Sequence, residues 1–345
     1  VWTENEDGEK IIVIKTTSDS EEGRLVSNTI HEIKTKIQAN NSDFAILYRT
    51  NAQSRAIEES LRRKNINYKI YGGLSFYQRK EIKDLLAYFR LSVNVNDEES
   101  LKRIINYPSR GIGTTTIQKL NFAANKYNLS IWEILSNIDK YEIKVNKGTR
   151  EKLSNFQILI NNFINNSKKK DAYEIAEEIT KSTGIYGLLY SDKTPEGITR
   201  LENVQELLNA IKNFSDSSEN NLNSLSDFIE DVALLTDQDQ ENEDDFNKVT
   251  LMTIHAAKGL EFKYVFVVGM EENLSPTMQS NESQESLEEE RRLFYVAITR
   301  AEKRLFLSYA NTRFKWGQYI DTDASRFLLE IDERFTEKKE TEEKK

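Results

Sequence analysis

The sequence predicts an α/β protein in which a domain built on a parallel sheet is interrupted by an all-helical insertion. Short apolar runs alternate with amphipathic segments over the first 76 residues, which is typical of a parallel sheet covered on both faces. This strand pattern is missing from about residue 80 to residue 235 and returns at residue 249. Gly and Pro, with 13 and 3 residues, are scarce against an average of roughly 12% together, which favours helix.

The first part of the chain contains predicted strands separated by helices. Short apolar runs predict the strands, and apolar residues at helical spacing predict the helices. The strands cover residues 11–14, 44–48 and 68–71, and the helices cover residues 26–37 and 52–64.

The middle of the chain shows helical periodicity alone, beginning at Ile82. The predicted helices lie near residues 115–126, 151–165, 171–183, 202–214 and 225–235. We expect residues 77–240 to form a helical domain that ends in an acidic linker at residues 237–245.

The alternating pattern then returns. Residues 249–254, 264–268 and 305–310 predict strands, and residues 288–300 predict a helix. We expect residues 1–76 and 241–335 to share one sheet and residues 336–345 to be a charged, solvated tail.

The composition excludes several classes of protein. The 345 residues carry a net charge of −9 and include no Cys and two His, His31 and His255. Disulfides, zinc fingers, iron–sulfur clusters and thiol nucleophiles are therefore excluded, and we expect no metal site. The lack of Cys is typical of a reducing cytoplasm, and no apolar run of about 18 residues predicts a membrane span. The acidic balance excludes coating of nucleic acid by bulk charge, although a local basic groove remains compatible with it.

A phosphate-binding loop is missing from the sequence. The pattern Gly-x-x-x-x-Gly-Lys-[Ser/Thr] needs a Gly-Lys dipeptide, and the sequence contains none. Asp97 and Glu98 imitate an Asp-Glu magnesium box, but they do not follow an apolar strand and are interpreted as a helix start. We expect no unaided NTP hydrolysis. Because the chain starts at Val1 and its Met residues all lie late, we also expect it to be a piece of a longer protein.

Two segments could act on a nucleotide. Residues 253–262 place His255, Lys258 and Glu261 between two strands, where α/β proteins bind ligands; a connection with solvated charges is the alternative. Residues 288–302 predict a helix that ends near Arg300, and an Arg there can reach a γ-phosphate held by a neighbouring domain. The alternative is a surface helix held by Glu–Arg pairs.

Other segments suit a nucleic-acid backbone. Arg110, Gly111 and Gly113 precede a helix, so close backbone approach and free N–H groups could bind a phosphate; a capped turn is the alternative. Arg49 and Asn51 follow a strand and offer donors to single-strand phosphates.

Aromatic and basic residues alternate at residues 76–80 and 313–319. Trp316 in the second segment is placed at a hairpin tip, where it could stack on a base; a half-buried core Trp is the alternative. His31 lies between Ile30 and Ile33 on a helix and is interpreted as structural.

In this order the segments resemble the UvrD/PcrA/Rep family of superfamily 1A DNA helicases, and most of all its PcrA branch. The resemblance covers residues 1–331 and rests on long, specific stretches. These are Leu-Tyr-Arg-Thr-Asn-Ala-Gln-Ser-Arg at 47–55, Tyr-Gln-Arg-Lys-Glu-Ile-Lys-Asp at 77–84, Arg-Gly-Ile-Gly at 110–113, His-Ala-Ala-Lys-Gly-Leu-Glu-Phe at 255–262 and Glu-Glu-Arg-Arg-Leu-Phe-Tyr-Val-Ala-Ile-Thr-Arg-Ala-Glu at 289–302.

The resemblance implies the C-terminal half of a cytoplasmic, ATP-dependent 3′→5′ DNA helicase of repair and plasmid replication. The sheet domain would be the RecA-like, P-loop-NTPase-type domain 2A, and the helical insertion would be domain 2B. The ATP-binding motifs would lie upstream of Val1, in an N-terminal RecA-like domain that binds most of the ATP and Mg²⁺. The implied partners are single-stranded DNA, single-strand–duplex junctions, that N-terminal domain, and repair, replication-initiator or RNA polymerase proteins; no membrane is implied.

The resemblance also implies roles for residues that match the family's motifs. Arg300 resembles the arginine finger on the γ-phosphate, and Glu261 resembles the residue that holds the ribose. Arg49 and Asn51 resemble contacts to single-stranded DNA, and His255 resembles the residue that couples the nucleotide cleft to the DNA.

In the helical domain, Arg110, Gly111 and Gly113 match the family's motif for duplex backbones. In the second part of the sheet domain, Trp316 matches the family's aromatic separation pin. The pattern departs at Ser75 and Thr277, so no DNA contact is implied there. Two other interpretations stay open: a stand-alone DNA-binding or regulatory module, and part of a helicase–nuclease subunit.

Overall fold

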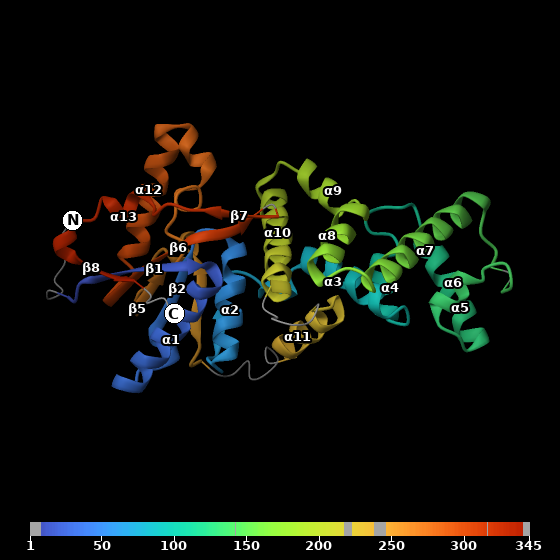
Figure 1. Ribbon diagram of the computed structural model, residues 1–345, viewed down its shortest axis with the longest axis horizontal. Coiled ribbons are helices and arrows are strands. Elements are labelled where there is room, and N and C mark those ends of the chain that lie inside the picture. Colours follow the sequence, from blue (N-terminus) through green and yellow to red (C-terminus); the bar gives the residue numbers. More distant parts are fainter. Residues whose placement is uncertain (1–7, 142, 217–222, 238–245, 316, 341–345) are drawn as a thin grey trace. The chain divides into compact units, whose positions relative to one another are not determined.

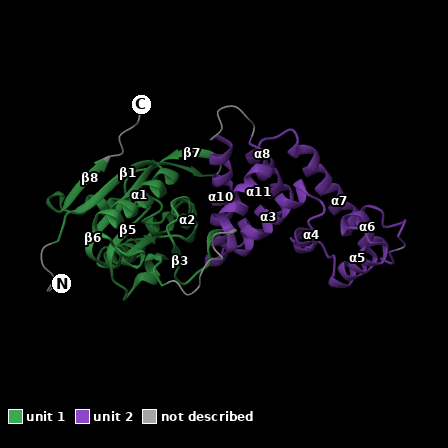
Figure 2. Ribbon diagram, turned by 90° about the horizontal axis from the view of Figure 1, so that it is seen from below, with its two compact units in different colours: residues 1–76, 238–345 green, residues 77–237 purple. Residues whose placement is uncertain are grey.

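The computed structural model describes residues 8–141, 143–216, 223–237, 246–315 and 317–340. The chain divides into two compact units, Val1–Phe76 with Gln238–Lys345, and Tyr77–Asp237 (Figure 2). The first unit contains the sheet, and the described residues of the second form helices joined by loops, with no strand. The predicted α/β class, with a parallel sheet and a helical insertion, is confirmed.

The sheet of the first unit follows the strand order β3-β4-β2-β5-β6-β1-β8, and all of these neighbours are parallel. β7 adds an antiparallel hairpin arm to β6. Segments from the two ends of the chain lie side by side, as the blue β1 beside the red β6 and β8 shows (Figure 1). The strands are β1 (Ile11–Ser18), β2 (Phe44–Tyr48), β3 (Tyr68–Ile70), β4 (Val249–Thr253), β5 (Phe262–Val267), β6 (Ala301–Lys315), β7 (Gln318–Asp321) and β8 (Thr336–Glu340).

Helices cover both faces of this sheet, because its central strands are apolar on both sides. β2 is buried at every position: Ile46 and Tyr48 face one core, and Ala45 and Leu47 face the other. The first core is closed by α1 (Asp19–Ile37) and α2 (Ser54–Arg63). The second is closed by α12 (Gln284–Ile298), α13 (Arg326–Leu329) and the 3₁₀ turn η5 (Ile254–Ala257).

The second unit is built around α3 (Lys80–Val93), whose Tyr88 and Phe89 are fully buried. α4, α7, α10 and α11 pack against α3, and α5 packs against α6. The remaining helices of the unit are α4 (Glu98–Ile104), α5 (Thr114–Tyr127), α6 (Ile131–Ser136), α7 (Lys147–Ser167), α8 (Ala172–Ser182), α9 (Ile185–Ser191), α10 (Pro195–Asp216) and α11 (Leu225–Asp237). None of the helices described in either unit is long and apolar enough to cross a bilayer.

The structure corrects the prediction for the C-terminal tail. Residues 336–340, expected to start a charged tail, form β8 and pair with β1 from Ile11↔Thr336 to Lys15↔Glu340. Strand pairing at a sheet edge needs backbone groups alone, so a run without apolar residues can add there. Residues 238–245 of the expected linker and residues 341–345 of the tail lie outside the described residues.

Candidate functional site

The candidate residues of the sheet unit lie at two opposite edges of the sheet. Arg49 and Asn51 follow β2 and His255 follows β4, and these strands are parallel, so all three belong to the carboxyl edge. Glu261 directly precedes β5 and Arg300 directly precedes β6, which places both at the amino edge. The structure thus separates the five candidate residues into two groups, at the carboxyl and amino ends of the strands, which the sequence did not predict.

The segment between β4 and β5 connects these two edges. It begins with η5, where the Thr253 hydroxyl caps the turn by accepting from the Ala256 N–H at 3.4 Å. Ile254 and Ala257 are buried in the core on this face, while His255 and Glu261 are exposed. Because β4 and β5 run in the same direction, the connection must return along the face of the sheet from one edge to the other.

α12 packs on the same face, beside η5. Phe294 and Ala297 of α12 enter the core, and Thr299 and Arg300 follow directly after its last turn. Glu290, in the middle of the helix, is 5% exposed. α12 therefore places the buried Glu290 carboxylate next to Arg49, and its C-terminal end is followed directly by Arg300.

Arg49 is held in place by Glu290. The Arg49 Nε lies 3.0 Å from both carboxylate oxygens, and its Nη2 lies 2.6 Å from Oε1. The Ser280 hydroxyl also donates to Glu290 Oε1, at 3.2 Å. A forked, charge-assisted pair of this kind fixes the orientation of the guanidinium. A phosphate that binds Arg49 therefore has to compete with Glu290.

His255 is electrostatically coupled to this pair. Partial burial, followed by the Arg49 cation, lowers the pKa of the imidazole below its ordinary value, against the opposing charges of Glu290 and Glu289. Both causes favour the neutral imidazole over the imidazolium. Asn51 lies exposed at the start of the 3₁₀ turn η2 (Asn51–Gln53), next to this pair in sequence.

At the amino edge, the Arg300 side chain folds back onto its own helix end and onto the crossover. Its Nε donates to Val296 O at 3.0 Å, and its Nη1 donates to Leu260 O at 2.9 Å. Its Nη2 donates to the Thr299 hydroxyl at 3.1 Å. Two of the five guanidinium N–H groups have no partner among the described protein residues.

The structure brings Arg300 and Glu261 together through the residues on either side of Glu261. Leu260 O accepts from the Arg300 guanidinium, and the Phe262 N–H donates to Arg300 O at 2.9 Å. The sequence interpretation of α12 as a surface helix with Glu–Arg pairs also holds for part of its length, because Arg292 pairs with Glu289 at 2.9 Å.

In the helical unit, the loop before α5 exposes its two glycines and turns its arginine inward. Gly111 and Gly113 are exposed, and Gly111 has a φ of 69°. The Arg110 Nη1 donates to the carbonyls of Ile104, Tyr107 and Pro108 at 3.0, 2.8 and 3.3 Å. Its Nη2 donates to the Tyr88 hydroxyl at 2.6 Å. The Nη1 and Nη2 groups of the guanidinium predicted as part of an anion site thus donate to the protein.

Two neighbours of Arg110 complete this loop. The Phe156 ring lies under the guanidinium, 5.4 Å from its centre. The Asn106 side chain accepts from the N–H groups of Arg110 and Ile112, each at 3.0 Å. The sequence analysis missed Asn106, although an Asn at the start of a Gly-rich turn is a known signal for side-chain-to-backbone bonding.

Trp316 lies outside the described residues. Its neighbours form the β6–β7 hairpin, in which the Phe314 and Tyr319 rings meet edge to face at 5.1 Å between centroids. Tyr319 is 57% exposed. Among the described residues, no three His, Asp or Glu side chains are grouped so as to hold a metal ion.

Comparison with known proteins follows this geometry. The family model for the UvrD-like helicase C-terminal domain matches residues 1–312. The chain is 42% identical to the ATP-dependent DNA helicase PcrA of Bacillus subtilis (strain 168) over 350 aligned residues, which cover 99% of the chain and 47% of that relative. It is 40% identical to the ATP-dependent DNA helicase PcrA of Staphylococcus aureus (strain Mu50), over 98% of the chain and 46% of the relative. The chain spans about half the length of these curated relatives.

Proposed function

The chain belongs to the UvrD-like helicase C-terminal domain family, and on that premise we propose that it is the C-terminal half of an ATP-dependent 3′→5′ DNA helicase. The intact protein would couple ATP hydrolysis to movement along single-stranded DNA and to duplex unwinding. The observation that carries the proposal is the pairing of Arg300 with the Glu261 segment at one edge of the sheet, joined by α12 to Arg49 at the other edge.

The amino edge fits the triphosphate of a nucleotide held by a preceding RecA-like domain. Arg300 offers a guanidinium that is already oriented by three protein contacts and still has donors to spare. When ATP is present, such a group stabilises the charge that develops on the transferred phosphoryl. Glu261 is exposed beside it and would accept from a ribose hydroxyl. We assign Mg²⁺ to the preceding domain, together with most of the ATP contacts.

The carboxyl edge fits single-stranded DNA. Asn51 and His255 are exposed and offer hydrogen bonds, while Arg49 is available to a phosphate only when Glu290 releases it. Because Glu290 lies on α12 and Arg300 follows directly after its last turn, a shift of α12 would change both edges together. We therefore propose α12 as the element that links nucleotide state to grip on the strand.

The helical unit would contact duplex backbone through the loop at residues 110–113. Its exposed glycines allow a phosphate to approach the N–H groups at the start of α5. Arg110 would contribute by holding the loop in shape through its bonds to three carbonyls. Trp316, at the tip of the β6–β7 hairpin in sequence, would act as the aromatic pin at the junction.

The test is Arg300→Ala in the full-length protein, with Arg292→Ala as the matched control. Arg292 lies on the same helix, is exposed and pairs with Glu289. We expect Arg300→Ala to lower DNA-stimulated ATP hydrolysis by roughly 10³-fold or more, while single-strand binding stays within about twofold and Arg292→Ala changes neither. Retained hydrolysis, or loss of DNA binding with hydrolysis preserved, would contradict the assignment and favour a binding module without ATPase activity.

A further inference from the structure

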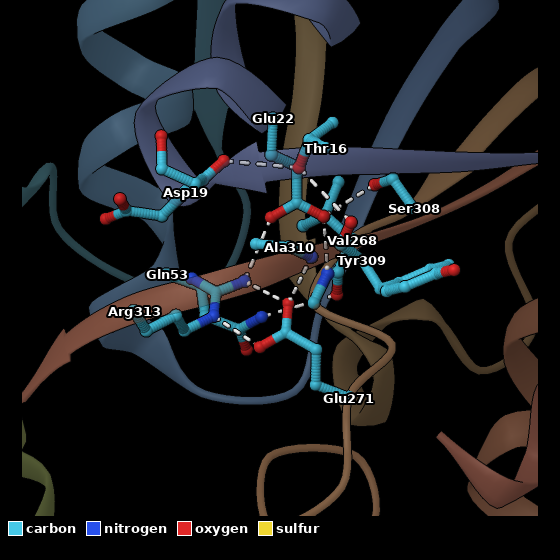
Figure 3. Close-up of polar contacts among 12 residues, drawn as sticks. Thr16, Asp19, Glu22, Gln53, Val268, Glu271, Ser308, Tyr309, Ala310 and Arg313 are labelled. Carbon is cyan, nitrogen blue, oxygen red and sulfur yellow. Dashed lines mark hydrogen bonds and ion pairs between the residues drawn. The ribbon is translucent and has the colours of Figure 1, made fainter. Parts of the chain in front are cut away.

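A buried ion cluster that none of the proposed sites uses lies in the sheet unit (Figure 3). It consists of Glu22 on α1, Glu271 after β5 and Arg313 on β6, which are 3%, 0% and 8% exposed. We call these three residues the Arg313 cluster. Charges this deeply buried are costly unless every polar atom is paired, so the bonds of the cluster show what holds it.

All four carboxylate oxygens of the cluster accept hydrogen bonds. Arg313 donates to both oxygens of Glu271, with its Nη2 at 2.8 Å from Oε1, and the same Nη2 donates to Glu22 at 3.0 Å. The other Glu22 oxygen accepts from Gly269 N–H at 2.9 Å and from the Ser308 hydroxyl at 2.7 Å. Glu271 also accepts from Ala310 N–H at 2.7 Å. The cluster therefore ties α1, the segment after β5 and β6 to one another.

Arg313 belongs to the part of β6 that forms the hairpin. It pairs with Ile320 of β7, whereas β6 pairs with β1 up to Thr312. All four residues of β7 are exposed, so β7 itself gains little from apolar burial, while Phe314 of β6 is buried. A two-stranded arm of this kind is marginal by itself. The buried guanidinium at its base thus attaches the arm to the sheet through two carboxylates.

The other end of the cluster reaches the loop that carries Arg49. Gln53 accepts from the N–H groups of Arg49 and Thr50 at 2.9 and 2.8 Å and donates to Val268 O at 3.3 Å. The next residue, Gly269, is the one that donates to Glu22. A Cβ at Gly269 would lie 2.0 Å from Gln53 Nε2, so this close approach depends on glycine. Figure 3 shows Gln53 beside the cluster; its bond to Val268 O reaches Glu22 through the adjoining Gly269 N–H.

We propose that Arg313 is a positioning residue that fixes the β6–β7 hairpin relative to the Arg49 loop. The proposal rests on the proposed helicase function, since it gives the hairpin the work of separating strands. A separating element has to stay in register with the strand that is being pulled past it. The planar guanidinium fork, bound to two carboxylates that are themselves fixed, supplies that rigidity.

The first test is Arg313→Lys in the full-length protein, with Arg326→Lys as the matched control. Arg326 forms the same kind of forked pair with Glu272, the neighbour of Glu271, but lies outside the hairpin. We expect Arg313→Lys to lower the number of base pairs unwound per ATP hydrolysed by roughly tenfold. This is less than the ~10²-fold cost of misplacing a catalytic group by 1 Å, because Arg313 acts only through the hairpin. Single-strand-stimulated ATP hydrolysis should stay within about twofold for both variants.

Combination with Trp316→Ala tests whether the effect passes through the hairpin. If Arg313 acts by placing the tip, Arg313→Lys has no further effect on unwinding once Trp316 is replaced. Additive losses, equal effects of Arg313→Lys and Arg326→Lys, or a parallel fall in ATP hydrolysis would overturn the proposal.

Limited trypsin digestion supplies a readout that does not depend on helicase activity. Arg313→Lys and Arg326→Lys each replace one trypsin-sensitive residue by another. Any change in cleavage after residue 313 or Lys315 therefore reports the mobility of the hairpin. We expect faster cleavage there in Arg313→Lys alone, and unchanged cleavage would overturn the proposal. If the wild-type protein does not unwind DNA, the proposed helicase function is contradicted. If Arg313→Lys still speeds cleavage of the hairpin in that case, Arg313 remains the residue that attaches the hairpin.

Discussion

Arg300 in the sheet unit and Arg110 in the helical unit were both predicted to meet phosphates, and the structure treats them differently. Arg300 is oriented by three protein acceptors and keeps two N–H groups without a described partner. Arg110 is bound by three carbonyls and the Tyr88 hydroxyl and lies over the Tyr88 and Phe156 rings. Arg110 also leaves its Nε–H without a described partner, so the number of remaining donors does not separate the two side chains. The difference teaches that the role of an arginine depends on what surrounds its guanidinium, here two aromatic rings and a cage of carbonyls at Arg110.

The largest expected effect comes from a charge-preserving change at Arg300. Arg300→Lys keeps the positive charge and loses the planar fork. We expect DNA-stimulated ATP hydrolysis of the full-length protein to fall by about 10²-fold or more, while the unfolding free energy changes by no more than about 1 kcal/mol. Steady-state hydrolysis and thermal melting measure the two quantities. A large loss of stability with little loss of hydrolysis would show that Arg300 has a structural role, which the comparison assigns to Arg110.

The matching change at Arg110 should act on stability. Arg110→Ala leaves three carbonyls and the Tyr88 hydroxyl without their donor, which we expect to destabilise the loop by about 2–3 kcal/mol. Hydrogen exchange of the Arg110 and Ile112 amides, which bond to Asn106, measures this directly. Arg150→Ala is the control, because Arg150 forms an exposed pair with Asp139. Unchanged exchange together with lost duplex binding would instead mean that Arg110 contacts DNA itself.

A smaller effect is expected at Gly111, which has a φ of 69°. Gly111→Ala forces an L side chain into left-handed backbone, at a cost of about 1 kcal/mol. It also places a Cβ 2.5 Å from the Lys152 Nζ, a flexible group that can move away. Duplex binding should weaken more than single-strand binding, as measured by fluorescence anisotropy with each DNA. Gly187→Ala is the control, since a Cβ there meets nothing within 4 Å; equal losses on both DNAs would indicate general unfolding.

The smallest expected effect concerns Glu22 in the Arg313 cluster. Burial, and to a lesser extent the Glu271 charge, raises the pKa of the Glu22 carboxyl above its ordinary value of 4.5, against the opposing pull of Arg313. The folded state then binds more protons than the unfolded state in the interval above the ordinary pKa, so stability falls as pH rises through the folded pKa.

Glu22→Gln should remove that slope, which cannot exceed about 1.4 kcal/mol per pH unit for one proton. Melting temperatures of wild type and variant between about pH 5 and pH 8 measure it. Identical pH profiles would mean that Arg313 keeps Glu22 fully ionised.

The sequence predicted local structure well where a segment buries many residues. Residues 44–48 were predicted as a strand and form β2 with the same bounds, because Phe-Ala-Ile-Leu-Tyr is apolar on both faces. The long α7 and α8 were also predicted. The helix start predicted at Asp97 and Glu98 is confirmed, because Asp97 caps α4. The short helices α6 and α9, of 6 and 7 residues, were missed because two turns are too few to show a period.

The sequence did not predict ion pairs between residues that lie far apart in the chain. Arg49 and Glu290 are 241 positions apart, and Arg313 and Glu22 are 291 apart. Nothing in the local pattern of either member distinguishes such a pair from a solvated charge. The partner is set by strand order, and here β6 lies between β5 and β1.

The sequence by itself determined the family, the division into a sheet and a helical insertion, and the residues that carry the family's motifs, because these depend on periodicity and on the order of residue types. The tertiary structure alone decided which candidates share an edge of the sheet, which groups hold Arg300 and Arg110 in place, and that a third arginine is buried between two carboxylates. The physical reason is that a hydrogen-bond partner is chosen by position in space, and the packing of β4, β5, β6 and α12 fixes that position.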